Sequence, residues 1–169
     1  MRLRFPSAVV LLALLALFTA APAQDSLGSK TPQVTALPTQ AVAVAPGGSV
    51  RVELRFRVGA GLHINSSKPR SEFLIPTRLK LNPPANLTPG PIVYPEGKEL
   101  TFAFSPQEKL NVYAGDFTVR AELRALRSAP PGSYKVQGEL RYQACNDRAC
   151  FPPAKLPVEF EVTVRKPRS

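Results

Sequence analysis

The stretch "VRVELRFRV", Val50 to Val58, alternates apolar and charged side chains without interruption. Successive side chains of a β-strand point to opposite faces, so this period of two predicts a strand with one buried face and one face in water. Further strands are expected where the alternation or a short apolar run recurs, at 79–81, 92–94, 117–123, 134–142 and 156–164.

Turn-forming segments separate these runs, among them "NPPANLTPGP" and "SAPPGS". The chain contains 19 prolines, which disfavour long helices. Glu122 to Ser128 is the one stretch that resembles a helical turn, and we interpret it as a strand that ends in a loop. Several short strands with one wet face predict an all-β antiparallel sandwich. There is no internal repeat and no sign of a second domain.

The N-terminal segment is typical of a secretory signal. Arg2 and Arg4 precede an apolar run from Ala8 to Phe18, and the small-residue pattern Ala21-Pro22-Ala23 follows. The run is shorter than the roughly 20 residues that span a bilayer, so we expect no transmembrane segment in this chain. The prediction is cleavage before Gln24 and export to an oxidising compartment.

These signals divide the chain into four parts. Residues 1–23 are the predicted signal peptide, and the polar, aperiodic residues 24–40 are a predicted flexible lead-in. Residues 41–165 form the predicted β-sandwich domain, and residues 166–169 form a short basic tail.

The chain is strongly basic, with 22 Lys and Arg residues against 12 Asp and Glu residues. Without Arg2 and Arg4 the mature chain keeps 20 basic residues against 12, a net charge of about +8. These charges alternate along the strands and do not cluster, which argues for a solvated basic surface and against a nucleic-acid partner. Such a surface can still attract acidic partners or anionic membranes.

The segment "YQACNDRACFPP", Tyr142 to Pro153, holds both cysteines of the chain, Cys145 and Cys150. One interpretation is a structural disulfide, which for so short a loop contributes only about 2 kcal/mol. A second is a redox pair, with Arg148 lowering a thiol pKa and Asp147 opposing it. The residues alone leave both open.

A third interpretation, a metal site, has less support. Two thiolates and His63, the single histidine, fall short of the four ligands of a closed zinc site. The one methionine, Met1, leaves with the signal, which argues against a sulfur-rich copper site. We therefore expect no metal and no cofactor, and we interpret His63 as a hydrogen-bonded structural residue.

The cysteine segment resembles the active-site segment of the N-terminal periplasmic domain of the DsbD thiol:disulfide interchange proteins. Members carry Tyr-Gln, a small residue, Cys, a short polar turn, Cys, an aromatic or aliphatic residue and Pro-Pro, which here run from Tyr142 to Pro153. Two other stretches are similar to the family, "GLHINSSKP" (Gly61 to Pro69) and the segment from Tyr94 to Asp116. The resemblance covers roughly residues 40–164.

The resemblance implies an immunoglobulin-like sandwich and thiol-disulfide exchange. It implies that Cys150 bonds to partner proteins and that Cys145 resolves the mixed disulfide. It also implies an aromatic cap over the disulfide from the region Thr101 to Tyr113, with Phe102 or Phe104 as the capping residue. Two further aromatic residues are expected to line the same pocket, Tyr142 and Phe151.

The implied partners are a membrane-embedded DsbD-like reductase, which supplies electrons, and exported thioredoxin-like proteins, which receive them.

Two departures from the family pattern matter. Some members have five residues between the cysteines, whereas this chain has four. Full-length members continue into transmembrane helices and a thioredoxin-like domain, whereas this sequence stops at Ser169. Two hypotheses follow, a dithiol–disulfide exchanger and a secreted β-sandwich binding module with an inert disulfide.

Overall fold

The computed structural model describes residues 33–103 and 105–166, and these residues form an all-β structure. None of the described segments forms a helix with the length and apolar character needed to cross a membrane. The strands are β1 (Val34–Ala36), β2 (Val42–Val44), β3 (Ser49–Val58), β4 (His63–Asn65), β5 (Arg78–Asn82), β6 (Leu87–Val93), β7 (Lys98–Phe102), β8 (Ser105–Tyr113), β9 (Asp116–Ala125), β10 (Gly132–Tyr142), β11 (Ala144–Cys145) and β12 (Ala154–Val164).

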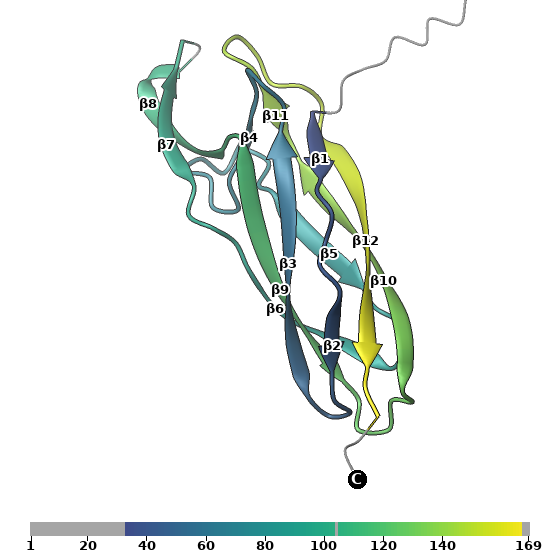
Figure 1. Ribbon diagram of the computed structural model, residues 1–169. Coiled ribbons are helices and arrows are strands. Elements are labelled where there is room, and N and C mark those ends of the chain that lie inside the picture. The colour runs from purple at the N-terminus through teal and green to yellow at the C-terminus, as the bar shows by residue number, and fades with distance from the viewer. Residues whose placement is uncertain (1–32, 104, 167–169) are drawn as a thin grey trace, which may run out of the picture. The chain divides into compact units, whose positions relative to one another are not determined.

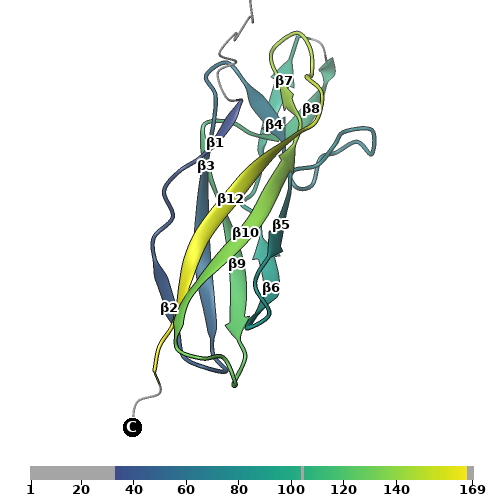
Figure 2. The same ribbon diagram turned by 90° about the vertical axis from the view of Figure 1, so that its right-hand side faces the viewer.

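Two four-stranded sheets form an immunoglobulin-like sandwich, and a third sheet lies at one end of it (Figures 1 and 2). The first sheet has the order β1-β3-β9-β6 and the second has the order β2-β12-β10-β5. Neighbouring strands are antiparallel except β2 and β12, which are parallel. The third sheet, β11-β4-β8-β7, carries the first cysteine on its edge strand. The predicted all-β sandwich is therefore confirmed.

Alternation along the strands produces the core, as the sequence predicts. Every second side chain of β3 is buried from Val52 to Val58, and β12 shows the same pattern toward its end. Phe56 of β3 stacks on Phe117 of β9, with ring centroids 5.3 Å apart. The outward side chains are charged, and Arg57 pairs with Asp116 across β3 and β9 at 2.6 Å. Because this pair is exposed, water screens it and burial of the apolar face dominates stability.

The first strand lies in the segment predicted as a flexible lead-in, 24–40. Val34 of β1 pairs with Val58 of β3 and is 1% exposed. A strand of three residues is too short to show a period, which is why the sequence did not reveal it. The ordered domain thus begins before residue 41. The predicted signal peptide, residues 1–23, and tail residues 167–169 lie outside the described residues.

Strand β6 forms one edge of the first sheet and pairs irregularly with β9. The register shifts between Pro89 and Ile92, which marks a bulge that contains Gly90 and Pro91. The two prolines have no N–H group, so this part of the edge offers few donors to another strand.

Strand β10 lies between β12 and β5 and contains a glycine at its centre, Gly138. A Cβ atom at this position would lie 2.4 Å from the carbonyl oxygen of Lys80 and 2.8 Å from Cδ2 of Leu81. The glycine in this otherwise regular strand therefore permits a close approach between β10 and β5.

Candidate functional site

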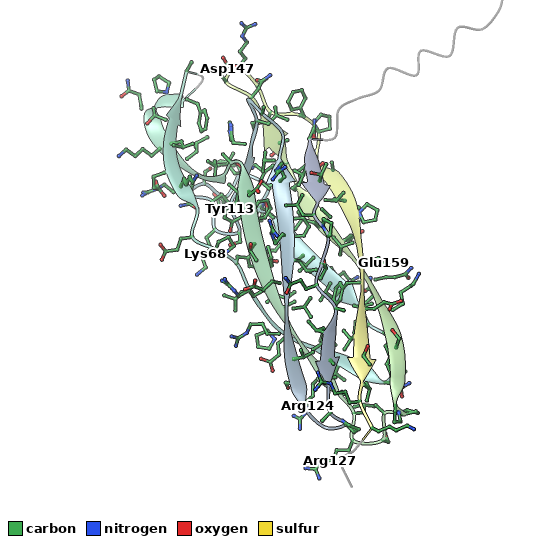
Figure 3. The ribbon with its side chains drawn as sticks, viewed as in Figure 1. Lys68, Tyr113, Arg124, Arg127, Asp147 and Glu159 are labelled. Carbon is green, nitrogen blue, oxygen red and sulfur yellow. A yellow bond between two sulfur atoms is a disulfide. The ribbon has the colours of Figure 1, made fainter. Side chains whose placement is uncertain are left out.

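The two cysteines form a disulfide bond at one end of the domain. The Sγ atoms of Cys145 and Cys150 are 2.03 Å apart, and the Cα atoms are 3.9 Å apart. The two residues also form an isolated antiparallel β-bridge, so they stand directly opposite each other. Asp147 marks the tip of the cysteine loop, residues 145–150, at the end of the domain opposite to Arg124 and Arg127 (Figure 3).

The cysteine loop is closed by hydrogen bonds as well as by the disulfide. On one side of the cysteines, the Phe151 N–H donates to the Ala144 carbonyl at 2.8 Å. On the other side, the Asn146 N–H donates to the Ala149 carbonyl at 3.0 Å. The Asn146 side-chain oxygen accepts from the N–H groups of Arg148 and Ala149, both at 2.8 Å. Cys145 and Cys150 therefore form a non-hydrogen-bonded pair, the kind of antiparallel pair in which opposing side chains are closest.

The side chain of Gln143 connects this loop to strand β4. Its amide nitrogen donates to the Phe151 carbonyl at 3.2 Å, and its oxygen accepts a longer bond, 3.4 Å, from the amide of Asn65. The same Asn65 amide donates to the Ile75 carbonyl at 3.0 Å. The glutamine of the "Tyr-Gln" motif therefore has a structural role, because it links the backbone at Phe151, just after the second cysteine, to Asn65 of β4.

The two cysteines differ sharply in their exposure to solvent. Cys145 lies on β11, where it pairs with His63 of β4, and is 0% exposed. Cys150 is exposed. An incoming molecule can therefore reach the sulfur of Cys150 more easily than that of Cys145.

His63 lies beside the buried cysteine. It pairs directly with Cys145 in the β4–β11 register and is 3% exposed. Its ring stacks on the ring of Phe102, with centroids 3.8 Å apart and planes 17° from parallel. Burial lowers the pKa of the imidazole below its ordinary value. That His63 is a hydrogen-bonded structural residue stays a prediction, and its stretch, "GLHINSSKP", is one of those that resemble the DsbD family.

Comparison with known proteins places this site in a family. The family model described as "Thiol:disulfide interchange protein DsbD, N-terminal" matches residues 33–161. The chain belongs to the DsbD N-terminal family. The resemblance seen in the cysteine segment is therefore confirmed. None of the curated proteins compared with the chain matches it.

Three solved structures similar to this chain come from two organisms. The reduced DsbD N-terminal domain of Neisseria meningitidis is 25% identical, with 78% of this chain and 86% of that chain covered and a TM-score of 0.43. The N-terminal periplasmic domain of ScsB from Proteus mirabilis is 14% identical, with coverages of 75% and 43% and a TM-score of 0.49. A complex of the DsbD and PilB N-terminal domains, also from Neisseria meningitidis, matches at 24% identity, with coverages of 73% and 80% and a TM-score of 0.41.

In the region that the DsbD resemblance predicts as a cap, Thr101 to Tyr113, the first two residues end β7, and residues 105–113 form β8. We call β7 and β8 together the cap hairpin. Phe102 reaches the site by stacking on His63, the neighbour of Cys145. Phe104 lies outside the described residues. That the hairpin caps the disulfide stays a prediction.

The other candidate site residues occupy different environments. Tyr142 is buried in the core; burial raises the pKa of its phenol, and a hydrogen bond with the backbone of Val34 opposes that rise. Phe151 is half-buried and packs against the core. Asp147 and Arg148 are exposed in the cysteine loop. That Tyr142 and Phe151 line a shared pocket stays a prediction. The effect of Asp147 and Arg148 on a thiol pKa stays a prediction as well.

Among the described residues, the cysteine pair is the candidate reactive site. Within residues 33–103 and 105–166, no cluster of three or more His, Cys, Asp or Glu side chains could hold a metal ion. A disulfide with one buried and one exposed sulfur can undergo thiol–disulfide exchange, which requires neither a metal nor a cofactor.

Proposed function

We propose that this member of the DsbD N-terminal family carries out thiol–disulfide exchange in an exported compartment, the bacterial periplasm. In this proposal a membrane-embedded DsbD-like reductase supplies two electrons, and the domain passes them to the disulfides of exported thioredoxin-like proteins. The observation that carries the proposal is the unequal exposure of the two cysteines, since Cys145 is buried and Cys150 is exposed.

Unequal exposure gives each cysteine a separate task. In the dithiol form, the thiolate of Cys150 attacks one sulfur of a partner disulfide, and the partner's other sulfur leaves as a thiolate. The thiolate of Cys145 then attacks the Cys150 sulfur and displaces the partner. The partner leaves with two thiols, and the domain keeps the disulfide that the structure contains. Two electrons have moved from the domain to the partner.

Reduction of the domain follows the same path in reverse. A thiolate of the upstream reductase attacks the exposed sulfur of Cys150, and Cys145 leaves as a thiolate. The second thiol of the reductase then resolves this mixed disulfide, so that the reductase is oxidised and the domain is a dithiol again. The exposed cysteine forms the intermolecular bond in both directions.

Such a cycle needs a loop that keeps its shape without the disulfide. The bonds from Phe151 to Ala144 and from Asn146 to Ala149 close the loop on either side of the cysteines. They involve no sulfur atom, so reduction leaves them in place. The two thiols therefore stay near bridging distance in the reduced protein.

The test is to trap partners with single-cysteine variants in the exported compartment. Cells express Cys145→Ser or Cys150→Ser, free thiols are blocked, and adducts are separated on non-reducing gels. We expect specific, reducible adducts with Cys145→Ser, because Cys150 attacks and nothing resolves the product. Cys150→Ser should give weak adducts or none, and the double variant is the control for background.

The contrary result is also well defined. An inert disulfide in a secreted binding module predicts adducts with neither variant, together with a reduction potential below about −300 mV, as is typical of structural bridges. That pair of results would reject exchange and leave the binding module as the function.

A further inference from the structure

Three side chains that can carry protons stand in a row across the end of the third sheet. His63 of β4 is directly opposite Cys145 of β11, and Cys145 is directly opposite Cys150. Directly opposite residues in antiparallel pairs point to the same face, with Cβ atoms about 4.5–5.5 Å apart. The imidazole, the buried sulfur and the exposed sulfur therefore share one face, with Cys145 in the middle.

The proposed exchange reaction places a specific demand on the middle residue. Resolution of a mixed disulfide on Cys150 requires Cys145 as a thiolate, since a thiol is a poor nucleophile. Cys145 is 0% exposed, and burial in apolar surroundings favours the neutral thiol. Solvent water has no direct access to remove the proton. A proton acceptor next to the sulfur would remove this obstacle.

We propose that His63 accepts the proton of the Cys145 thiol during resolution and donates a proton to Cys145 when the disulfide is reduced. This inference rests on the exchange function proposed above. In resolution, the S–H proton moves to the imidazole, the Cys145 thiolate attacks the Cys150 sulfur, and the partner's sulfur leaves as a thiolate. The imidazolium then gives up its proton to solvent or to that leaving thiolate. In reduction, the imidazole first takes a proton from solvent or from the attacking thiol of the reductant, and the imidazolium then protonates the departing Cys145 thiolate.

The surroundings of His63 suit this task. A base must be neutral before it acts, and burial favours the neutral imidazole near neutral pH. The Phe102 ring stacks on the imidazole and fixes its orientation. The other titratable side chains of the third sheet lie on β7, β8 and β11, and they are Lys98, Glu99, Glu108, Lys109, Tyr113 and Cys145. Of these, Cys145 stands directly opposite His63.

The test separates attack by Cys150 from resolution by Cys145 in a single reaction. Fully reduced mature protein is mixed with dithiobis-nitrobenzoate, a symmetric disulfide that releases a coloured thiolate. Attack by Cys150 releases the first thiolate, and resolution by Cys145 releases the second. The wild-type protein is compared with His63→Phe, which keeps an aromatic ring for Phe102 to stack on but has no nitrogen.

We expect the first phase to be unchanged in His63→Phe and the second to slow by at least about a hundredfold at neutral pH, the lower end of the range for loss of a general base. The pH profile should change as well. In the wild type the second phase should level off above the imidazole pKa, whereas in the variant it should keep rising toward the thiol pKa. Phe73→Ala is the control, because it removes an aromatic ring that is 88% exposed and keeps both the imidazole and Phe102, and its second phase should stay near the wild-type rate.

The outcomes distinguish this inference from the function on which it rests. A normal second phase and pH profile in His63→Phe would overturn the role of His63 and leave the exchange function intact. Absence of the second phase in the wild type would overturn both. If His63→Phe does not fold, His63→Gln replaces it, with the same slowed second phase expected and an unchanged one overturning the inference.

Discussion

Reduction of the disulfide should leave the domain folded, with only a modest loss of stability. The bridge closes a loop of six residues, from Cys145 to Cys150. For a loop of this length the chain-entropy relation gives about 2 kcal/mol of stabilisation. The hydrogen bonds that close the loop contain no sulfur, so we expect no further loss from collapse of the local structure.

The same stabilisation energy lowers the reduction potential of the disulfide. If the folded state stabilises the disulfide by about 2 kcal/mol, its potential should lie about 40 mV below that of the same cysteines in the unfolded chain. A domain of this size typically has a stability of about 5–15 kcal/mol, so the reduced form remains folded. Both redox states are then available for exchange.

Two measurements check this reasoning. Urea unfolding is followed with and without a phosphine reductant, and the potential is titrated against glutathione in buffer and in concentrated urea. A loss of about 4 kcal/mol or more, or unfolding on reduction alone, would mean that the hydrogen bonds cannot hold the loop and that the bridge is a structural requirement.

Four further results are expected. Because the folded-state pKa of His63 lies below its ordinary value of 6.5, the unfolded chain binds the proton first; the free energy of unfolding should therefore fall as pH drops below about 6.5, and His63→Phe should remove that part of the slope. Phe102→Ala should speed reduction of the disulfide by a small thiol if the cap hairpin limits access, whereas Phe73→Ala, at a side chain 88% exposed, should not. Leu140→Ala, at a fully buried side chain, should cost about 2–5 kcal/mol in urea unfolding. Gly138→Ala should cost about 1–3 kcal/mol by the same measurement, because the added methyl group meets the Lys80 carbonyl, and a cost near zero would mean that β10 and β5 can separate freely.

The sequence predicts those parts of the fold in which every second residue meets the core. Val50 to Val58 and Leu156 to Val164 are long enough for the alternation to be unmistakable, and they became β3 and β12. Strands of two or three residues, such as β1 and β11, are too short to show any period. Their positions depend on pairing with distant strands, which a single sequence does not display.

The cysteine site divides in a similar way. The pair itself and the motif around it are local, so the sequence could point to Cys145 and Cys150. The position of His63 is not local, because it is 82 residues from Cys145 in the chain and becomes its neighbour only through the pairing of β4 with β11. The burial that makes Cys145 differ from Cys150 likewise comes from packing across the sheet.

The irregular pairing of β6 with β9 has a consequence for the behaviour of the protein at high concentration. An exposed, regular edge strand is a template on which a second molecule can add its own strand and start aggregation. Here the bulge between Pro89 and Ile92 bends the edge, and the prolines at 89 and 91 supply no N–H donors to an incoming strand. A copy that approached this edge would find neither a straight partner nor a full set of hydrogen bonds. The domain can thus expose a long sheet edge to crowded surroundings and remain protected against fibril-like stacking there.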